Sequence, residues 1–159
     1  VVLIHCRKAG IPIQWLLHDL SKYSFPEFIP GAKYYTGKAS PQVGERLEFG
    51  YYAAWLHHKG RNKHHFEYWL DTTYPAKMPK KYVMEMFCDR VAAGKVYNKE
   101  NFKQEDPYYY FERSKNKIER LMHPETMALL EKLLTMYKDK GEKETFFYMR
   151  KALKKDKNY

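Results

Sequence analysis

Apolar residues recur at helical spacing along most of the chain, and this pattern predicts helices almost throughout. The clearest case is the segment 80–97, where Val83, Phe87 and Val91 each lie four residues apart. Pro79 directly precedes this segment, and proline is favoured at a helix start. Alternating strand patterns and the hairpin dipeptides Asn-Gly and Asp-Gly are absent. The sequence therefore predicts an all-α fold.

Glycine, proline and capping residues predict where the other helices begin and end. Gly10 and Pro12 end a first helix, and Ser24 with Glu27 three residues later has the spacing of a capping box. The further segments that we expect to be helical are 13–20, a long helix from Pro41 to Gly60, 63–71, 107–122, 124–140 and 143–155. We expect one domain over residues 1–159, a bundle of about six to eight helices, in which residues 107–159 pack on a functional core formed by residues 1–97.

Length and composition fit one globular, intracellular domain. The chain has 159 residues, of which 44% are hydrophobic and 30% charged. Its apolar runs are far shorter than the ~18 residues that suggest a membrane span, and no signal peptide is visible. The two cysteines, Cys6 and Cys88, are too few for a secreted disulfide scaffold. We expect both to be reduced and buried, the protein to be cytoplasmic, and no membrane partner.

The net charge of +10 favours anionic partners such as phosphates, nucleotides or nucleic acid. The basic residues are spread along the chain, and the densest run, 151–159, has the character of a solvated helix end. A small phosphorylated partner is therefore favoured over nucleic acid, which stays an alternative.

Histidines gather in the first part of the chain. Six of the seven lie before residue 66, and the string HHKGRNKHH holds four of them: His57, His58, His64 and His65. One pair ends a predicted helix and the other begins the next, so a turn at Gly60 can bring both pairs to one point. Any one of them could be an ordinary core or capping histidine, but their clustering favours a metal site.

The pattern excludes two common zinc motifs and favours a mixed histidine and carboxylate site. Two distant cysteines form no CxxC pair, and HExxH is absent. Imidazole and carboxylate together bind divalent ions in mononuclear and dinuclear hydrolases. Two carboxylates are candidates: Asp19, beside His18 in HDLSK, and Asp89 on an apolar helix, where an ion pair with Arg90 is the alternative role.

The strings HDLSK (18–22), HH (57–58) and FCDRVAA (87–93) together resemble the HD-domain superfamily of metal-dependent phosphohydrolases. The resemblance implies a helical fold in which His18, Asp19 and Asp89 hold a divalent metal ion, and His57 and His58 correspond to the additional histidines of members that hold two or more ions. Lys22 matches the lysine that lies near the substrate phosphate in HD-x-G-K members, although Ser21 replaces their glycine.

This resemblance implies the remaining roles in the site. His57, His58, His64 and His65 would divide between ligation of a second ion and general-acid work, with His58 and His64 nearest the metal and His64 a catalytic candidate. Lys22 and Arg61 would stabilise charge on the phosphoryl oxygens. The metal could be Mn, Fe, Zn, Ni, Co or Mg. Glu27, Glu48 and Glu67 are candidates to orient imidazoles, although for Glu27 the capping box is the favoured role.

A longer similarity, from about Cys6 to the string HPETMALLEKLL, links the chain to an uncharacterised bacterial and phage family of unknown function. Members carry a histidine a few positions upstream of the residue that corresponds to Val1, so His5 is a poor match to the first HD ligand.

Three functions remain open at this point. The first is a metal-dependent phosphohydrolase acting on a nucleotide or another small phosphate ester. The second is a non-catalytic protein that keeps an HD-like site to bind a metal or nucleotide. The third is a basic helical module for nucleic acid or a protein partner, in which the histidines are structural.

Overall fold

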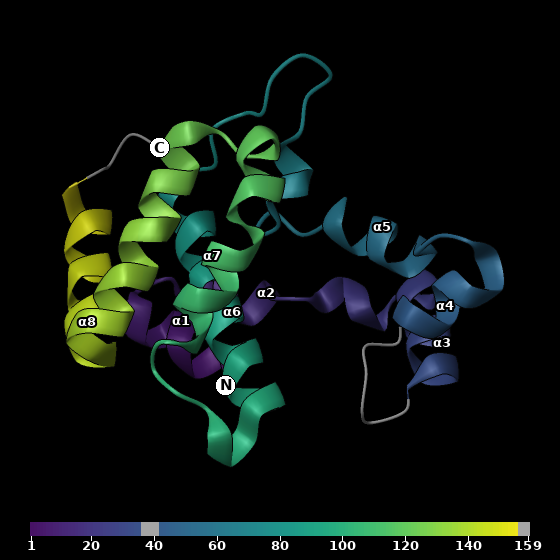
Figure 1. The fold of residues 1–159 in the computed structure, drawn as a ribbon, viewed down its shortest axis with the longest axis horizontal. Coiled ribbons are helices and arrows are strands. Elements are labelled where there is room, and N and C mark those ends of the chain that lie inside the picture. Colours follow the sequence, from purple (N-terminus) through teal and green to yellow (C-terminus); the bar gives the residue numbers. More distant parts are fainter. Residues whose placement is uncertain (36–41, 156–159) are drawn as a thin grey trace.

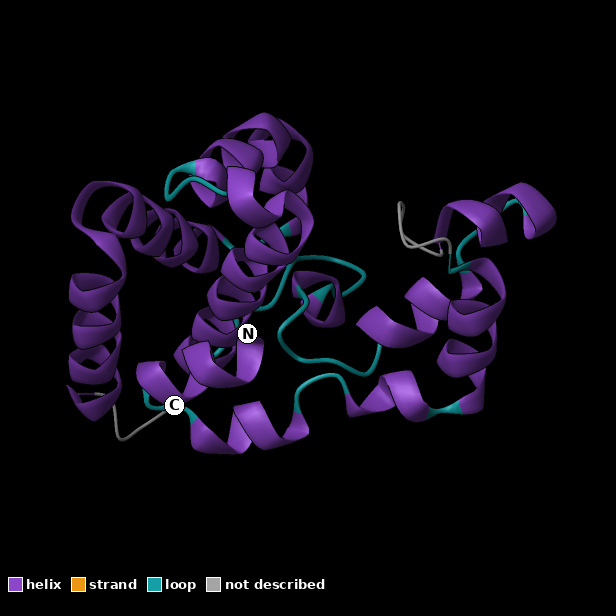
Figure 2. Ribbon diagram, turned by 90° about the horizontal axis from the view of Figure 1, so that it is seen from below, coloured by secondary structure: helices purple, strands orange, loops and turns teal. Residues whose placement is uncertain are grey.

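A computed structural model describes residues 1–35 and 42–155 and confirms the all-α fold (Figures 1 and 2). Within these ranges there are eight α-helices and no β-strand, apart from one isolated bridge between Leu70 and Pro75. The α-helices are α1 Val2–Ala9, α2 Pro12–Leu17, α3 Phe25–Tyr34, α4 Gln42–Phe49, α5 Ala53–Lys59, α6 Lys80–Asn98, α7 Asp106–Ile118 and α8 Pro124–Lys155. Short 3₁₀ turns are η1 Leu20–Tyr23, η2 Phe66–Trp69, η3 Lys99–Asn101 and η4 Glu119–Leu121. None of these helices has the length and apolar content needed to cross a bilayer.

Helix α6 is the centre of the main bundle and packs against α1, α7 and α8. Its predicted apolar face is buried at Val83, Phe87 and Val91. The ring of Phe87 meets the rings of Tyr137 and Phe146 edge-on, at centroid distances of 5.7 and 6.2 Å. Full burial of one such side chain contributes about 1.5–3 kcal/mol, so this packing is the main source of the bundle's stability.

Helix α8 turns back on itself at Gly141, where φ is 79° and ψ is −178°. A side chain rarely adopts this positive φ, and glycine does so without strain. The break lies where the sequence predicts one helix to end and the last one to begin. The segment after it packs back on α1, because its buried face carries Phe146 and Met149.

A second, smaller part of the molecule is formed by α3, α4 and α5, which pack on one another and project away from the bundle (Figures 1 and 2). We call these helices, with their connections (residues 25–35 and 42–59), the lobe. None of the residues of the hydrophobic core cluster comes from the described part of the lobe. Among the lobe residues whose burial the structure describes, the buried ones are Glu27, Glu45 and His58, all of them polar.

The long helix predicted from Pro41 to Gly60 is wrong, because two helices take its place. Helix α4 ends at Phe49, and Gly50 then adopts a φ of 79°, which reverses the chain. The carboxylate of Glu45 accepts hydrogen bonds from the backbone N–H of Ala54, at 2.9 and 3.2 Å, and so satisfies the start of α5. Pro41 itself lies outside the described residues. The helix expected over 63–71 is likewise reduced to the single turn η2.

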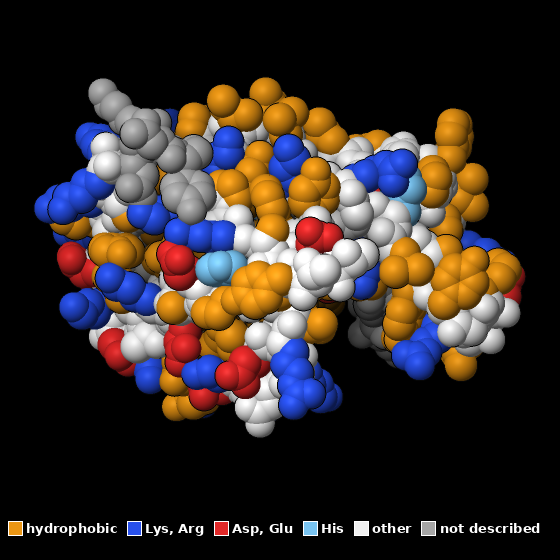
Figure 3. All heavy atoms as spheres, turned by 90° about the horizontal axis from the view of Figure 1, so that it is seen from above, with side chains coloured by type: hydrophobic (Ala, Val, Ile, Leu, Met, Phe, Trp, Pro, Cys, Tyr) orange, Lys and Arg blue, Asp and Glu red, His pale blue; other side chains and the backbone are white. Residues whose placement is uncertain are grey.

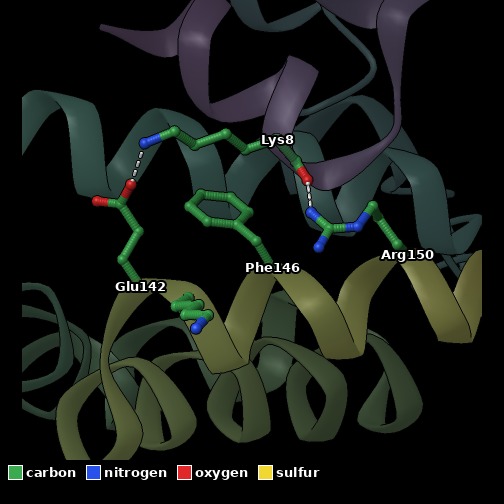
Figure 4. Close-up of a pocket in the computed structure, with 5 residues that line it drawn as sticks. Lys8, Glu142, Phe146 and Arg150 are labelled. Carbon is green, nitrogen blue, oxygen red and sulfur yellow. Dashed lines mark hydrogen bonds and ion pairs between the residues drawn. The ribbon is translucent and has the colours of Figure 1, made fainter.

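Glu142 holds the segment of α8 that follows Gly141 against α1, and Figure 4 shows its contact with Lys8. Its carboxylate accepts hydrogen bonds from Lys8 at 2.5 Å and from Lys95 at 2.9 Å, so one side chain joins α8 to α1 and α6. Arg150 reinforces the same contact by donating to the carbonyl of Lys8 at 2.5 Å. Burial alone would raise the pKa of Glu142, but the two lysines lower it from 4.5 to about 2.

We predict that Glu142→Gln destabilises the protein by about 1–2 kcal/mol at pH 7, since the side chain is 30% exposed and its pairs are partly screened by solvent. A carboxylate with a lowered pKa stabilises the fold above its unfolded pKa, and this contribution is lost as the pH falls through the folded value. The difference in unfolding free energy between the variant and the wild type should therefore narrow as the pH falls from about 5 toward 2. Urea unfolding of both proteins at several pH values measures this difference. Glu144→Gln, at an exposed neighbour without an ion pair among the described residues, is the control and should show no such difference.

Candidate metal centre

Four segments of the chain meet where the lobe joins the bundle. His18 and Asp19 lie between α2 and η1, and His58 lies in the last turn of α5. His64 and His65 follow on the loop before η2, and Asp89 projects from α6. The structure thus brings together six of the residues that the sequence singles out, from positions as far apart as 18 and 89.

One group of possible metal ligands consists of Asp19, His58, His64 and His65. One ligand atom from each lies within 4.8 Å of all the others. The Oδ1 atom of Asp19 is 3.3 Å from Nε2 of His58 and 3.4 Å from Nε2 of His64. A carboxylate with several imidazoles around it is a typical donor set for a divalent transition metal.

A second group consists of His18, His64 and Asp89, also with ligand atoms within 4.8 Å of one another. The Nε2 atom of His18 is 3.5 Å from Oδ1 of Asp89 and 3.3 Å from Oδ2 of Asp19. His64 belongs to both groups, and the two oxygens of Asp19 face different groups. The geometry therefore offers two adjacent ligand sets joined by shared side chains.

Several polar atoms at this point are buried without a hydrogen-bond partner. They are Nε2 of His18, Oδ1 of Asp19, Nε2 of His64 and Nε2 of His65. Each buried polar atom left unpaired costs about 1–3 kcal/mol, so four of them in one place need an explanation. All four belong to the two ligand groups, and a bound cation would satisfy them together. The residues therefore fit a divalent ion.

Two buried glutamates orient the imidazoles by contacts at Nδ1, the ring nitrogen that faces away from the ligand groups. Oε1 of Glu85 lies 3.0 Å from Nδ1 of His18 and 3.3 Å from Nδ1 of His64. Oε2 of Glu27 lies 2.7 Å from Nδ1 of His58. A carboxylate that accepts the Nδ1–H holds the ring so that the lone pair of Nε2 faces the ligand group.

The charges around the site favour a cation. Burial would raise the pKa values of Asp19 and Asp89, but contacts with His58 and with His18 respectively lower them, so both stay ionised. Burial would lower the pKa of His18, but the nearby carboxylates of Asp89 and Glu85 raise it to about 10. The protein alone thus balances these carboxylates with protons on histidine, and a bound cation would displace those protons.

His65 is already in the form that binds metals. Burial, together with the charges of His64 and His58, lowers its pKa to about 3, so its imidazole is neutral at physiological pH. The indole of Trp55 packs edge-on against this ring at 4.9 Å and stacks on His58 at 5.5 Å. This packing fixes the two imidazoles relative to each other.

The backbone at Asp19 has an unusual conformation, with a φ of 57° and a ψ of 21°. Positive φ is uncommon outside glycine, although aspartate tolerates it better than most residues. This turn lies between α2 and η1 and allows adjacent side chains, those of His18 and Asp19, to reach the same point. Strained positions of this kind concentrate at functional sites.

Lys22 lies at the rim of the site. Its Nζ atom is 2.5 Å from Oδ2 of Asp19, and its side chain is 62% exposed. Asp89 is also partly open, with 31% of its side chain exposed, whereas the side chains of His18, His58 and His64 are more deeply covered. Solvent and a small ligand therefore approach the site from the side of Asp89.

Not all candidates of the sequence analysis reach the site. His57 lies outside both ligand groups, because its Nδ1 is held 2.6 Å from Oε1 of Glu27. Arg61 is exposed, and its side chain forms no ion pair with the ligand groups in the described ranges. His64, expected in a catalytic role, occupies a ligand position in both groups. His5 is elsewhere, buried against the carbonyl of Cys88 at 3.4 Å.

The prediction of a capping box at Ser24 and Glu27 is wrong, and Glu27 contacts histidines instead. Ser24 forms no side-chain cap and donates instead to the carbonyl of Ser21. The glutamate turns inward to the histidines, which is the orienting role that the sequence analysis gave second place. Of the other two candidates for that role, Glu48 pairs with Lys33 at 2.7 Å on the surface. Glu67 leaves its Oε2 atom buried without a partner.

Glu85 was not identified from the sequence. It lies four residues before Asp89 on α6, which is the helical spacing that puts two side chains on one face. Apolar residues surround it in the string VMEMFC, where a carboxylate must find a partner. The same reasoning that singles out Asp89 would have found it.

The comparisons with known proteins agree with the longer similarity noted in the sequence. No curated protein and no solved structure gives a significant match. A model of a family of unknown function, DUF5662, matches residues 1–136, which include every member of both ligand groups. Because this match covers most of the chain, the protein belongs to the DUF5662 family of unknown function.

Proposed function

We propose that this protein is a metal-dependent phosphohydrolase of the HD type that acts on a nucleotide or another small phosphate ester. The observation that carries the proposal is the convergence of four buried, unpartnered ligand atoms on one point beside an exposed lysine. The strings HDLSK and FCDR provide independent support, because the residues that they align with HD ligands are members of the two groups. The family match itself carries no activity.

The donor atoms indicate which ions suit the site. Four imidazoles and two carboxylates make up the two groups. Mixed nitrogen and oxygen donors suit Mn, Fe, Co, Ni or Zn, whereas Mg prefers oxygen ligands alone. An ion held there supplies Lewis acidity, which activates water near neutral pH and polarises a phosphoryl oxygen.

The chain's own residues divide the remaining work. Asp19, His64 and Asp89 would anchor the ions, and Glu27 and Glu85 keep the imidazoles oriented. Lys22 supplies a mobile positive charge at the rim, where it can leave Asp19 to neutralise a phosphate oxygen.

We predict that the protein, purified without a histidine tag or added ions, contains a divalent transition metal and that His64→Ala removes it. His64 takes part in both ligand groups, so its loss should weaken binding by at least about 10–100-fold. Elemental analysis after gel filtration measures the content. His123→Ala is the matched control, because His123 lies outside both groups and should leave the metal in place. Equal metal content in the two variants would exclude the site.

We also predict metal-stimulated release of phosphate from at least one member of a nucleotide and phosphate-ester panel. Asp89→Asn should lower the rate by about 100-fold or more, because it removes a charged ligand. Lys22→Gln should lower kcat/KM about tenfold or more with the metal still bound, because it removes only a contact to phosphate.

The outcomes separate the proposal from its alternative. If wild type and Asp89→Asn released phosphate at the same rate, the hydrolysis would come from a contaminant and not from this site. Tight metal binding with no turnover on any substrate would favour a non-catalytic metal-binding or nucleotide-binding protein.

A further inference from the structure

The lobe has its polar residues inside and its apolar residues outside. The buried residues described for it are all polar, and the two buried carboxylates are tied to histidines or to the backbone. Nine of its large apolar side chains are each more than half exposed: Phe25, Phe28, Ile29, Tyr35, Val43, Leu47, Phe49, Tyr51 and Leu56. Tyr34, Tyr52 and Trp55 are partly buried. Figure 3 shows hydrophobic side chains gathered over this part of the molecule, on the right.

This arrangement is the reverse of what stabilises an isolated helical unit in water. Burial of apolar surface is the dominant favourable contribution to folding, and the lobe obtains little of it from its own helices. Its polar contacts contribute less, because each replaces hydrogen bonds to water. The lobe therefore needs a cover that is present whenever the protein is folded.

The size of the apolar surface matches a protein interface. With about 200 Å² for a fully exposed large side chain, the nine residues present roughly 1,000 Å². Apolar patches on ordinary monomers reach about 300–600 Å², and each partner of a standard stable complex buries about 800 Å². Summed over the lobe, this apolar area is sufficient for one side of a stable dimer.

The charge of the lobe indicates which partner fits. The sequence from 25 to 59 contains four basic and three acidic side chains, so this segment carries a net charge of only +1 in a chain of net charge +10. An acidic protein or an anionic membrane would be attracted to the basic remainder of the chain. An apolar face with so little net charge can instead meet its own copy across a twofold axis with little repulsion, and a second copy is always available.

We infer that the lobe is a homodimer interface, in which α3 and α4 of one chain pack against the lobe of a second copy. This inference does not depend on the metal site or on catalysis. The pair would bury the apolar residues of both lobes and enclose the polar network that holds His57 and His58.

Light scattering after gel filtration at micromolar concentration tests the inference. The unmodified chain should have twice the 19.2 kDa mass of one chain. The double variant Val43→Glu and Leu47→Glu places two charges on one face of α4, at side chains that are 53% and 84% exposed, and should have the mass of one chain. Phe28→Glu on α3 is a second, independent disruption with the same expected result.

The matched control is the double variant Val96→Glu and Tyr97→Glu on α6. These side chains are 56% and 71% exposed, so the control makes the same change in charge at similar exposure but outside the lobe. It should keep the mass of the dimer, and circular dichroism should show the same helix content in all variants. A one-chain mass for the unmodified protein, with or without binding to lipid vesicles, would overturn the inference. A dimer that survives in both lobe variants would overturn it equally.

Discussion

The carboxylate of Glu85 is the interaction on which the arrangement of the molecule depends. It is buried on α6, the central helix of the bundle, and its partners His18 and His64 come from the two segments that lead into and out of the lobe. An ionised carboxylate in such a position is stable only while it is paired. The pairing therefore fixes the lobe to the bundle and, through the same bonds, directs two imidazoles into the site.

Occupation of the ligand groups by a cation would be coupled to the stability of the junction between the lobe and the bundle. The bundle is held by apolar packing around α6, whereas the junction with the lobe is held by histidines and carboxylates. A cation at the ligand groups would satisfy the unpartnered atoms and strengthen the junction, but it would add little to the bundle itself. The stability of the junction would thus depend on the cation concentration, whereas the stability of the bundle would depend on it much less.

Much of the bundle could be predicted from the sequence, since its helices have regular apolar spacing and clear start and stop signals at Pro79, Pro124 and Gly141. The lobe was predicted less well. Its helices are short, their apolar residues face outward, and the break at Gly50 depends on a contact between Glu45 and Ala54 that no periodicity reveals. Local patterns describe what a helix buries, and here the lobe's apolar face is not buried within the chain.

The convergence of the histidines and Asp19 was predicted better than the helices around them. Clustering identified His58, His64 and His65, and the motif HDLSK identified His18 and Asp19, because these signals lie close together in sequence. The choice between His57 and its neighbour could not be made, since it depends on which ring α5 turns inward. The histidine partners of Glu27 and Glu85 lie more than 20 residues away along the chain, and a single sequence does not identify which histidines these are.

The left-handed backbone at Asp19 constrains which sequences can occupy this turn. Most residues would lose about 1–2 kcal/mol there, whereas glycine and asparagine adopt the conformation readily. The position thus serves two separable purposes, a carboxylate for the site and a backbone shape for the turn. Glycine would keep the shape and remove the charge, and glutamate would keep the charge and strain the shape. Few single substitutions can satisfy both, so this aspartate limits sequence change at the turn more than a surface ligand would.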